Sequence, residues 1–275
     1  VATSLPNGAT DGSQGNDQFM TYLAPRVEGT FNIAMGAPNN VFPSFRNALR
    51  HLAVSGITGD VTVRVFDGSY NEQIHVPYIQ GVGGSTTVKF VAAPNNAPEV
   101  TWAPSNHPNG MYGLYEADYA QVTLLANSSV IFENMIFRLP NSVSWGGHIL
   151  GEGIMDLYAD NCRFTGPSGY LNARDDYSIS VDGGNTSVHD CSFTKMRYGI
   201  YAESYSGNEV ELHGNSFENV RMGITAASNN LSVWGNNIKG ESASNDFTGI
   251  YAMGSGSVAS NRIYAEDAGR DGDEA

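Results

Sequence analysis

The chain has 275 residues, of which 41% are hydrophobic and only 15% are charged, and it contains 32 glycines. Its formal net charge is −14, from 28 acidic against 14 basic residues, and such a surface repels phosphate backbones and argues against nucleic-acid binding. No run of about 18 apolar residues occurs, so we expect no membrane insertion. Many glycines and few charges favour short strands and turns over helices.

Residues 1–28 are polar and rich in Gly, Asn and Ser, which predicts a leader or linker. One amphipathic helix is predicted at about 43–55, because Pro43 suits a first helical turn and Gly56 suits a helix end. The apolar residues of this segment share one side of the helix: Phe45, Leu49, Leu52 and Ala53. We expect this helix to cap the apolar interior of a following β solenoid.

Short alternating segments separated by Gly and Pro turns follow the helix, which is typical of strands. A six-residue sequence motif then occurs three times, beginning at Val188, Leu212 and Val233, and a Gly-Ile-x-Ala segment follows each copy. A large apolar residue ends each copy of this motif and each similar segment before and after the three copies. These residues are Phe137, Phe164, Phe193, Phe217, Ile238 and Ile263. Their separations of 27, 29, 24, 21 and 25 residues predict an all-β fold, a parallel β-helix over 29–264, with 265–275 as an acidic tail or truncated next coil.

A second column lies two positions before the first: Met135, Cys162, Cys191, Asn215, Asn236 and Asn261. Stacked asparagines on three coils predict an amide ladder in which each side chain bonds to the next coil. The two cysteines lie one coil apart, so their Cα atoms should be roughly 5 Å apart. That spacing allows a disulfide or two free stacked thiols, and both remain open.

The segment from Gly29 to Gly81, with its Gly68-Ser69-Tyr70-Asn71-Glu72 turn, together with the later coils, resembles a known group. It is similar to right-handed parallel β-helix modules of large secreted surface proteins of Bacteroidetes-type bacteria. The resemblance covers about residues 29–264. It implies a right-handed β-helix and export, often by the type IX route.

The same opening also resembles pectin methylesterases, through the helix, the Gly68–Glu72 turn and the coil at 156–164. Their activity needs two aspartates with glutamines and an arginine around the tetrahedral intermediate. The Gln-Ala-Val-Ala and Gly-Thr-Val-Asp-Phe-Ile-Phe-Gly stretches of that family are missing, and Gly147-His148-Ile149-Leu150 is nearest to the first. We therefore expect no esterase activity.

Pectate-lyase-like enzymes hold Ca²⁺ with carboxylates and use an arginine or lysine as the base. The nearest candidates here for such a site are Arg174, Asp175, Asp176, Asp182, Lys195 and Arg197. Ca²⁺ would be the cofactor of this alternative, although an Arg-Asp-Asp loop is more often a solvated turn. Otherwise no cofactor is expected.

Histidines and tyrosines offer two further candidate sites. His148, His189 and His213 suggest metal binding, but no third ligand is evident beside His189 and His213, so stacked surface histidines are favoured and no metal is expected. The tyrosines in question lie on or near one outward column: Tyr198, Tyr201, Tyr205 and Tyr251. They either stack on sugar rings or shield the backbone, and shielding is favoured.

The positions that are the same in each copy of the repeat are turn, core and ladder residues. This pattern indicates a structural scaffold. The leading hypothesis is a non-catalytic, secreted module of a cell-surface or extracellular structural or adhesive protein. The partners expected are other copies, packed end to end into filaments, or neighbouring modules of a longer chain. The alternatives are a polysaccharide lyase or related enzyme acting on acidic glycans, and a polysaccharide-binding module without turnover.

Overall fold

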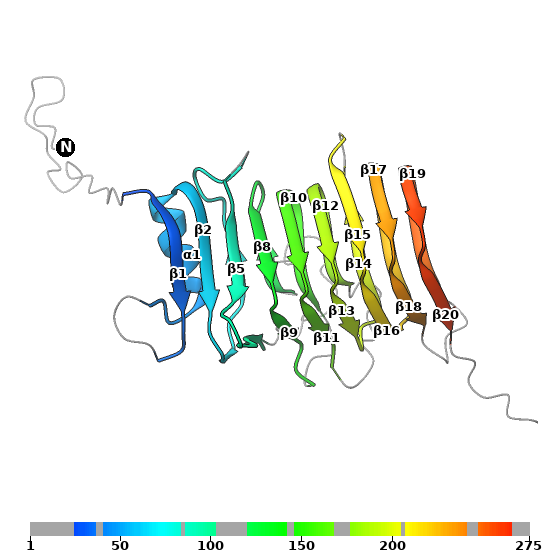
Figure 1. Ribbon diagram of the computed structural model, residues 1–275, viewed down its shortest axis with the longest axis horizontal. Helices are drawn as coiled ribbons and strands as arrows, with labels where there is room; N and C mark the ends of the chain where they lie inside the picture. The colour runs from blue at the N-terminus through cyan, green and yellow to red at the C-terminus, as the bar shows by residue number, and fades with distance from the viewer. Residues whose placement is uncertain are drawn as a thin grey trace, which may run out of the picture.

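A computed structural model describes these residues: 25–36, 41–83, 86–102, 120–141, 146–167, 177–204, 207–240 and 247–265. Within them, one helix is followed by strands that wind into coils stacked along the long axis of the molecule (Figure 1). Every pairing between the named strands is parallel. The predicted fold class, an all-β right-handed parallel β-helix, is confirmed.

Each complete coil has three faces. The β1 face contains β1 (Val27–Ile33), β2 (Ile57–Val65), β5 (Val88–Ala92), β8 (Ser129–Glu133), β15 (Glu209–His213) and the C-terminal parts of four long strands, β10 (Gly147–Asp160), β12 (Tyr177–His189), β17 (Met222–Trp234) and β19 (Thr248–Ala259). The β14 face contains β4 (Ile74–Val76), β7 (Ala120–Leu124), β14 (Tyr198–Glu203) and the N-terminal parts of the same long strands. The β20 face contains β3 (Ser69–Tyr70), β6 (Glu99–Val100), β9 (Ile136–Arg138), β11 (Arg163–Thr165), β13 (Ser192–Thr194), β16 (Ser216–Val220), β18 (Asn237–Gly240) and β20 (Arg262–Ala265).

The long strands turn the corner between the β14 and β1 faces without leaving the sheet. In β12 the corner falls at Gly183, whose φ is 120°, and Gly184. A Cβ atom on Gly184 would lie 1.7 Å from the carbonyl oxygen of Met155 on the preceding coil. Only glycine lets the backbones come this close, so the corner fixes which residues face outward on either side of it.

The corner between the β1 and β20 faces uses one left-handed residue per coil. These residues form a column: Asn134, Asn161, Asp190, Gly214, Gly235 and Ser260, with φ between 48° and 67°. Asn, Asp and Gly tolerate this conformation better than other residues do, which explains their recurrence at the position. The column repeats the same corner on successive coils and keeps them in register.

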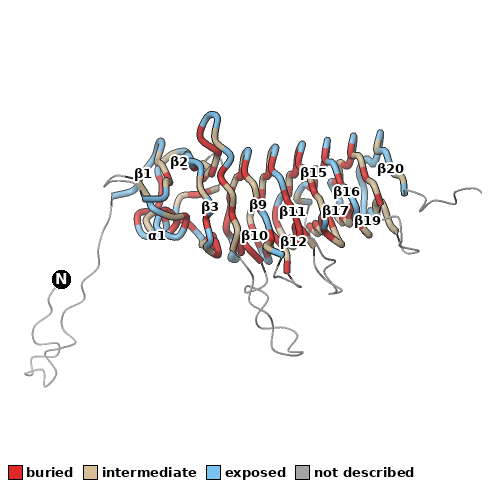
Figure 2. The backbone as a smooth tube through the Cα atoms, turned by 90° about the horizontal axis from the view of Figure 1, so that it is seen from below, coloured by how far each residue is buried: buried red, intermediate tan, exposed pale blue. Residues whose placement is uncertain are grey.

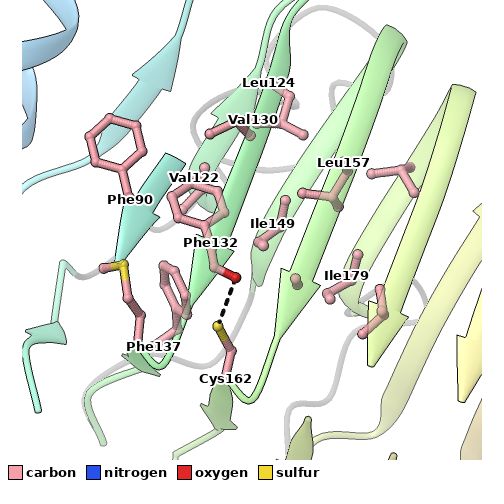
Figure 3. Packing of buried hydrophobic residues seen from close by; sticks show 14 of the residues in the cluster. Phe90, Val122, Leu124, Val130, Phe132, Phe137, Ile149, Leu157, Cys162 and Ile179 are labelled. Atoms are coloured by element: carbon pink, nitrogen blue, oxygen red, sulfur yellow. Dashed lines mark hydrogen bonds between the residues drawn. The ribbon is translucent and has the colours of Figure 1, made fainter. Parts of the chain in front are cut away.

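The apolar column predicted from the repeat fills the interior of the β20 face. Phe137, Phe164, Phe193 and Phe217 are paired in register and stacked, with ring centroids 5.2, 4.9 and 4.7 Å apart. Figure 3 shows Phe137 beside Phe132 in the core. The buried stretches recur coil after coil in Figure 2. The predicted register of the repeat is therefore confirmed.

The second column forms a hydrogen-bonded ladder next to this core. The Asn236 side chain accepts from the Asn215 backbone N–H at 3.0 Å and donates to the Leu212 carbonyl oxygen at 2.9 Å. Asn261 makes the equivalent bonds to the coil of Asn236. Cys162 and Cys191 are free buried thiols, and the Cys162 N–H donates to Cys191 Sγ at 3.3 Å. Of the two alternatives for the cysteines, the structure shows free thiols.

The helix α1 (Phe45–Ser55) begins two residues later than predicted, because Ser44 is its N-cap and accepts from the N–H of Asn47. Phe45, Ala48, Leu49 and Leu52 are buried, and the Phe45 ring lies 5.5 Å from that of Phe90. The helix thus buries its apolar side against the first coils, and its role as a cap stays a prediction.

The strands begin at Val27 and end at Ala265, close to the predicted limits of the β-helix, while the predicted leader and tail fall almost entirely outside the described residues. On the last coil Val258 and Ile263 are about half exposed, whereas Val233 and Ile238, their partners on the preceding coil, are buried. In the described part of the chain, no helix has the length and hydropathy needed to cross a membrane.

Candidate functional site

The richest cluster of chemically active side chains lies on the outside of the β1 face, over β10, β12, β15 and β17. Parallel pairing places Asp160, His189, His213 and Trp234 in one row, each on its own coil. The residues just before them in each strand are buried, so alternation along the strands turns this row outward. In Figure 1 these strands lie side by side.

The rings of this row stack into one continuous column. The ring centroids of His189 and His213 are 3.6 Å apart, and those of His213 and Trp234 are 4.3 Å apart at an interplanar angle of 14°. Tyr158 meets His189 edge-on, and its hydroxyl lies 3.2 Å from His189 Nδ1. The column ends in Trp234, which is 45% exposed and is paired with Ala259 on the next coil. We call the row formed by Asp160, His189, His213 and Trp234 the histidine row.

Glu211 lies beside the two stacked imidazoles on the same face, within reach of both Nε2 atoms. Its carboxylate oxygens are 3.4 Å from His189 Nε2 and 3.8 Å from His213 Nε2. The ligand atoms of His189, Glu211 and His213 all lie within 4.8 Å of one another. Burial, followed by the neighbouring His213, lowers the pKa of His189, so its neutral form is favoured.

The expectation of stacked surface histidines needs one correction. His189 and His213 do stack, but His189 is only 8% exposed, because Tyr158 and His213 cover its ring. The sequence interpretation missed Glu211, Tyr158 and Trp234. Strand alternation was the available signal: Glu211 lies two residues before His213 and points the same way, and Trp234 holds the histidine position in the third copy of the repeat.

His148 does not belong to this group, since it points into the interior. It is fully buried, with Nδ1 2.9 Å from the Ser178 hydroxyl and Nε2 3.1 Å from the Thr165 carbonyl oxygen. Burial lowers its pKa to about 4. Its hydrogen bonds join two strands, which indicates a structural role.

The predicted tyrosines lie on the outside of the β14 face. Tyr201 and Tyr251 share one column with Thr225 between them, and Tyr251 is 53% exposed. Tyr177, which the sequence interpretation missed, lies 4.9 Å from Tyr198 and 5.3 Å from Tyr201 between ring centroids. Tyr205 lies outside the described residues.

Three carboxylates run beside these tyrosines, on neighbouring coils. Glu152 pairs with Asp182, and Asp182 pairs with Glu203, whose carboxylate accepts a hydrogen bond from the Tyr201 hydroxyl. Partial burial, then Glu203 and Glu152, raises the pKa of Asp182. This strip of the β14 face therefore combines aromatic rings with strong hydrogen-bond acceptors.

The described members of the predicted lyase site are not brought together. Asp182 pairs with Glu203 at one end of β14, whereas Arg197 precedes Tyr198 at the other end, about 20 Å away along the strand. Lys195 lies in the turn after β13, with φ of 59°. Arg174, Asp175 and Asp176 fall outside the described residues.

A hollow of about 180 Å³ lies between α1 and β4, and its lining residues are Arg46, Leu49, Arg50, Gln73, His75 and Pro77. None of the predicted site residues lines it. Next to it, Glu72 accepts hydrogen bonds from the N–H groups of Phe45 and Arg46. The methylesterase-like turn thus supports the helix start in this chain.

No protein-family model matches the chain, and no curated protein matches it significantly. Among solved structures, the chain is similar to a pectin methylesterase from Aspergillus niger, with 13% identity and a TM-score of 0.36, over 88% of this chain and 91% of that one. The parallel strand ladders, and not this likeness, identify the fold, and no function is transferred. The resemblance to secreted Bacteroidetes modules stays a prediction.

Proposed function

We propose that this chain is a non-catalytic module of an extracellular or cell-surface protein and that it adheres to neutral glycans through the β14 face. The observation that carries the proposal is the tyrosine strip, formed by Tyr177, Tyr198, Tyr201 and, two coils further, Tyr251. Aromatic rings on a rigid sheet offer flat apolar surfaces on which sugar rings stack. Tyr201 and Tyr251 are about 10 Å apart at the usual strand spacing, so one extended saccharide can contact both.

The carboxylates beside the strip support the choice of a neutral ligand. Asp182 and Glu203 accept hydrogen bonds from sugar hydroxyls, and charge-assisted bonds are stronger than neutral ones. The same carboxylates and the net charge of −14 repel uronate polymers. Acidic glycans, the substrates of the lyase alternative, therefore suit this surface less well than neutral ones.

The distance between Asp182 and Arg197 supports a binding role over a lyase role, because a base and a cation-holding carboxylate must reach the same sugar. Self-association stays part of the proposal. Light scattering at increasing protein concentration tests it, and a constant monomer mass would contradict it.

Retention on immobilised neutral polysaccharides, measured for wild type and variants, tests the glycan proposal. We expect Tyr251→Ala and Tyr201→Ala each to weaken binding by about fivefold, the value of one lost ring stack. Tyr78→Ala is the matched control, because Tyr78 is equally exposed but lies near α1, and it should bind like wild type. Equal losses in all three variants would refute a site at the strip.

A separate assay distinguishes binding from turnover. Uronic-acid polymers with Ca²⁺ are incubated with the chain while the absorbance of new double bonds is followed. We expect no increase. Turnover that disappears in Arg174→Ala or Asp176→Ala would establish the lyase function in place of the proposed one.

A further inference from the structure

The histidine row contains a buried nitrogen whose hydrogen-bonding capacity is unused. Among the described residues, Nε2 of His189 is a buried side-chain atom with no hydrogen-bond partner. The carboxylate of Glu211 lies only 3.4 Å away, yet outside hydrogen-bonding geometry. A buried polar atom without a partner costs free energy, so its position calls for a ligand.

The distances within this cluster are close to those between ligands of one metal ion. Two atoms that each lie about 2.1 Å from a tetrahedral centre are about 3.4 Å apart. His189 Nε2 lies 3.4 Å from one oxygen of Glu211, and His213 Nε2 lies 3.8 Å from the other. The ligand atoms of all three side chains lie within 4.8 Å of one another, so one ion could contact all three after the side chains adjust.

We propose that His189, Glu211 and His213 bind one divalent transition-metal ion, such as Zn²⁺ or Cu²⁺, on the outside of the β1 face. Two imidazole nitrogens and one carboxylate suit these ions, whereas Ca²⁺ and Mg²⁺ prefer oxygen ligands alone. Water completes the coordination, because the side chain of Glu211 is 32% exposed. The site lies across the glycine corner from the tyrosine strip and does not depend on glycan binding.

The surroundings of the cluster orient the ligands and attract a cation. The Tyr158 hydroxyl lies 3.2 Å from His189 Nδ1, so Nδ1–H can donate to it while Nε2 keeps its lone pair for the ion. Asp160, on the preceding coil, pairs with His189, and Asp190 directly follows His189 in the chain. Both carboxylates add negative potential on the path by which a cation approaches.

Equilibrium dialysis of the chelator-treated protein against Zn²⁺ tests the site. We expect about one ion per chain for wild type, an affinity lowered at least about tenfold in Glu211→Gln, and no binding in a His189→Gln/His213→Gln variant. His75→Gln, which removes an exposed histidine of β4, is the control and should bind like wild type. Unchanged uptake by the double variant, or no uptake by wild type, would overturn the proposal.

Tryptophan fluorescence supplies a second measurement that locates the ion. Trp234 stacks on His213, so Cu²⁺ bound at the site should quench its emission, and Zn²⁺ should compete with the quenching. Trp234→Phe should lose the quenching while retaining metal in dialysis. Because His189 is buried, the partly exposed Glu211→Gln and His213→Gln single variants keep the test valid if the double variant does not fold. Quenching of equal strength in His213→Gln would place the ion elsewhere and refute the assignment.

Discussion

The carboxylate of Glu72 accepts a 2.8 Å hydrogen bond from the backbone N–H of Phe45, the first residue of α1, and a second from the N–H of Arg46. The two residues are 27 positions apart, so this contact ties the turn after β3 to the start of the helix. A carboxylate at a helix N-terminus satisfies free N–H groups and interacts favourably with the helix dipole.

We therefore expect Glu72→Ala to lower the free energy of unfolding by about 1–2 kcal/mol. Urea denaturation followed by circular dichroism measures this change. Glu218→Ala is the control, because the Glu218 side chain is 56% exposed and should change stability by less than about 0.5 kcal/mol. Equal effects of the two substitutions would contradict the role given to Glu72.

Asn236→Ala should be more costly, because Asn236 is 1% exposed and satisfies the Asn215 N–H and the Leu212 carbonyl. Alanine leaves both groups buried without these partners, at a cost of about 3 kcal/mol. Asn230→Ala is the control, because Asn230 is an exposed asparagine of β17, the strand that ends just before Asn236, and its expected change is below about 0.5 kcal/mol. If the two variants unfold at the same denaturant concentration, the ladder is not a source of stability.

His148 predicts a pH dependence of stability. Its pKa is about 4 in the folded chain against 6.5 for the free group, so the unfolded state binds more protons between these values. The stabilisation is present in full above pH 6.5 and is lost as the pH falls towards 4, by about 3 kcal/mol in total. His148→Gln should flatten this slope in urea titrations at several pH values, while His75→Gln should leave it unchanged. A slope identical to wild type in His148→Gln would rule out His148 as the cause.

Cys191 should resist thiol reagents in the folded chain. Burial, with the neighbouring Cys162, raises the pKa of its thiol well above the ordinary value, and only the thiolate reacts. A colorimetric disulfide reagent should therefore modify neither cysteine at neutral pH and both in strong denaturant. Rapid modification of the native chain would show that the coils open locally at this position.

The register of the later coils could be predicted because the repeat marks it directly. Phe193, Phe217 and Ile238 stand at the same place in each copy of the motif, and parallel pairing requires the same face to recur on each coil. The left-handed corner was not predicted, although its signal was present in Asn161, Asp190 and Gly214. Side-chain type alone does not reveal this column, because a positive φ is a property of the backbone and Asn, Asp and Gly are also common in ordinary turns.

The histidine row could be predicted only in part. The shared position of His189 and His213 was visible, but the partnership of Glu211 depends on which rotamers bring its two oxygens near the Nε2 atoms of both rings. The burial of His189 depends on Tyr158, which comes from the preceding coil. Such contacts join residues on different coils, and the loop lengths that separate them vary along the chain.

The asparagine ladder has a direction. Asn215, Asn236 and Asn261 each bond backward: the carboxamide oxygen accepts an N–H from the coil before, and the amide donates to a carbonyl of that coil. A coil that has just formed therefore presents a backbone N–H to which the asparagine of the next coil can bond. A polypeptide emerging N-terminus first would dock its coils one after another in the order of synthesis, each finished coil being the template for its successor.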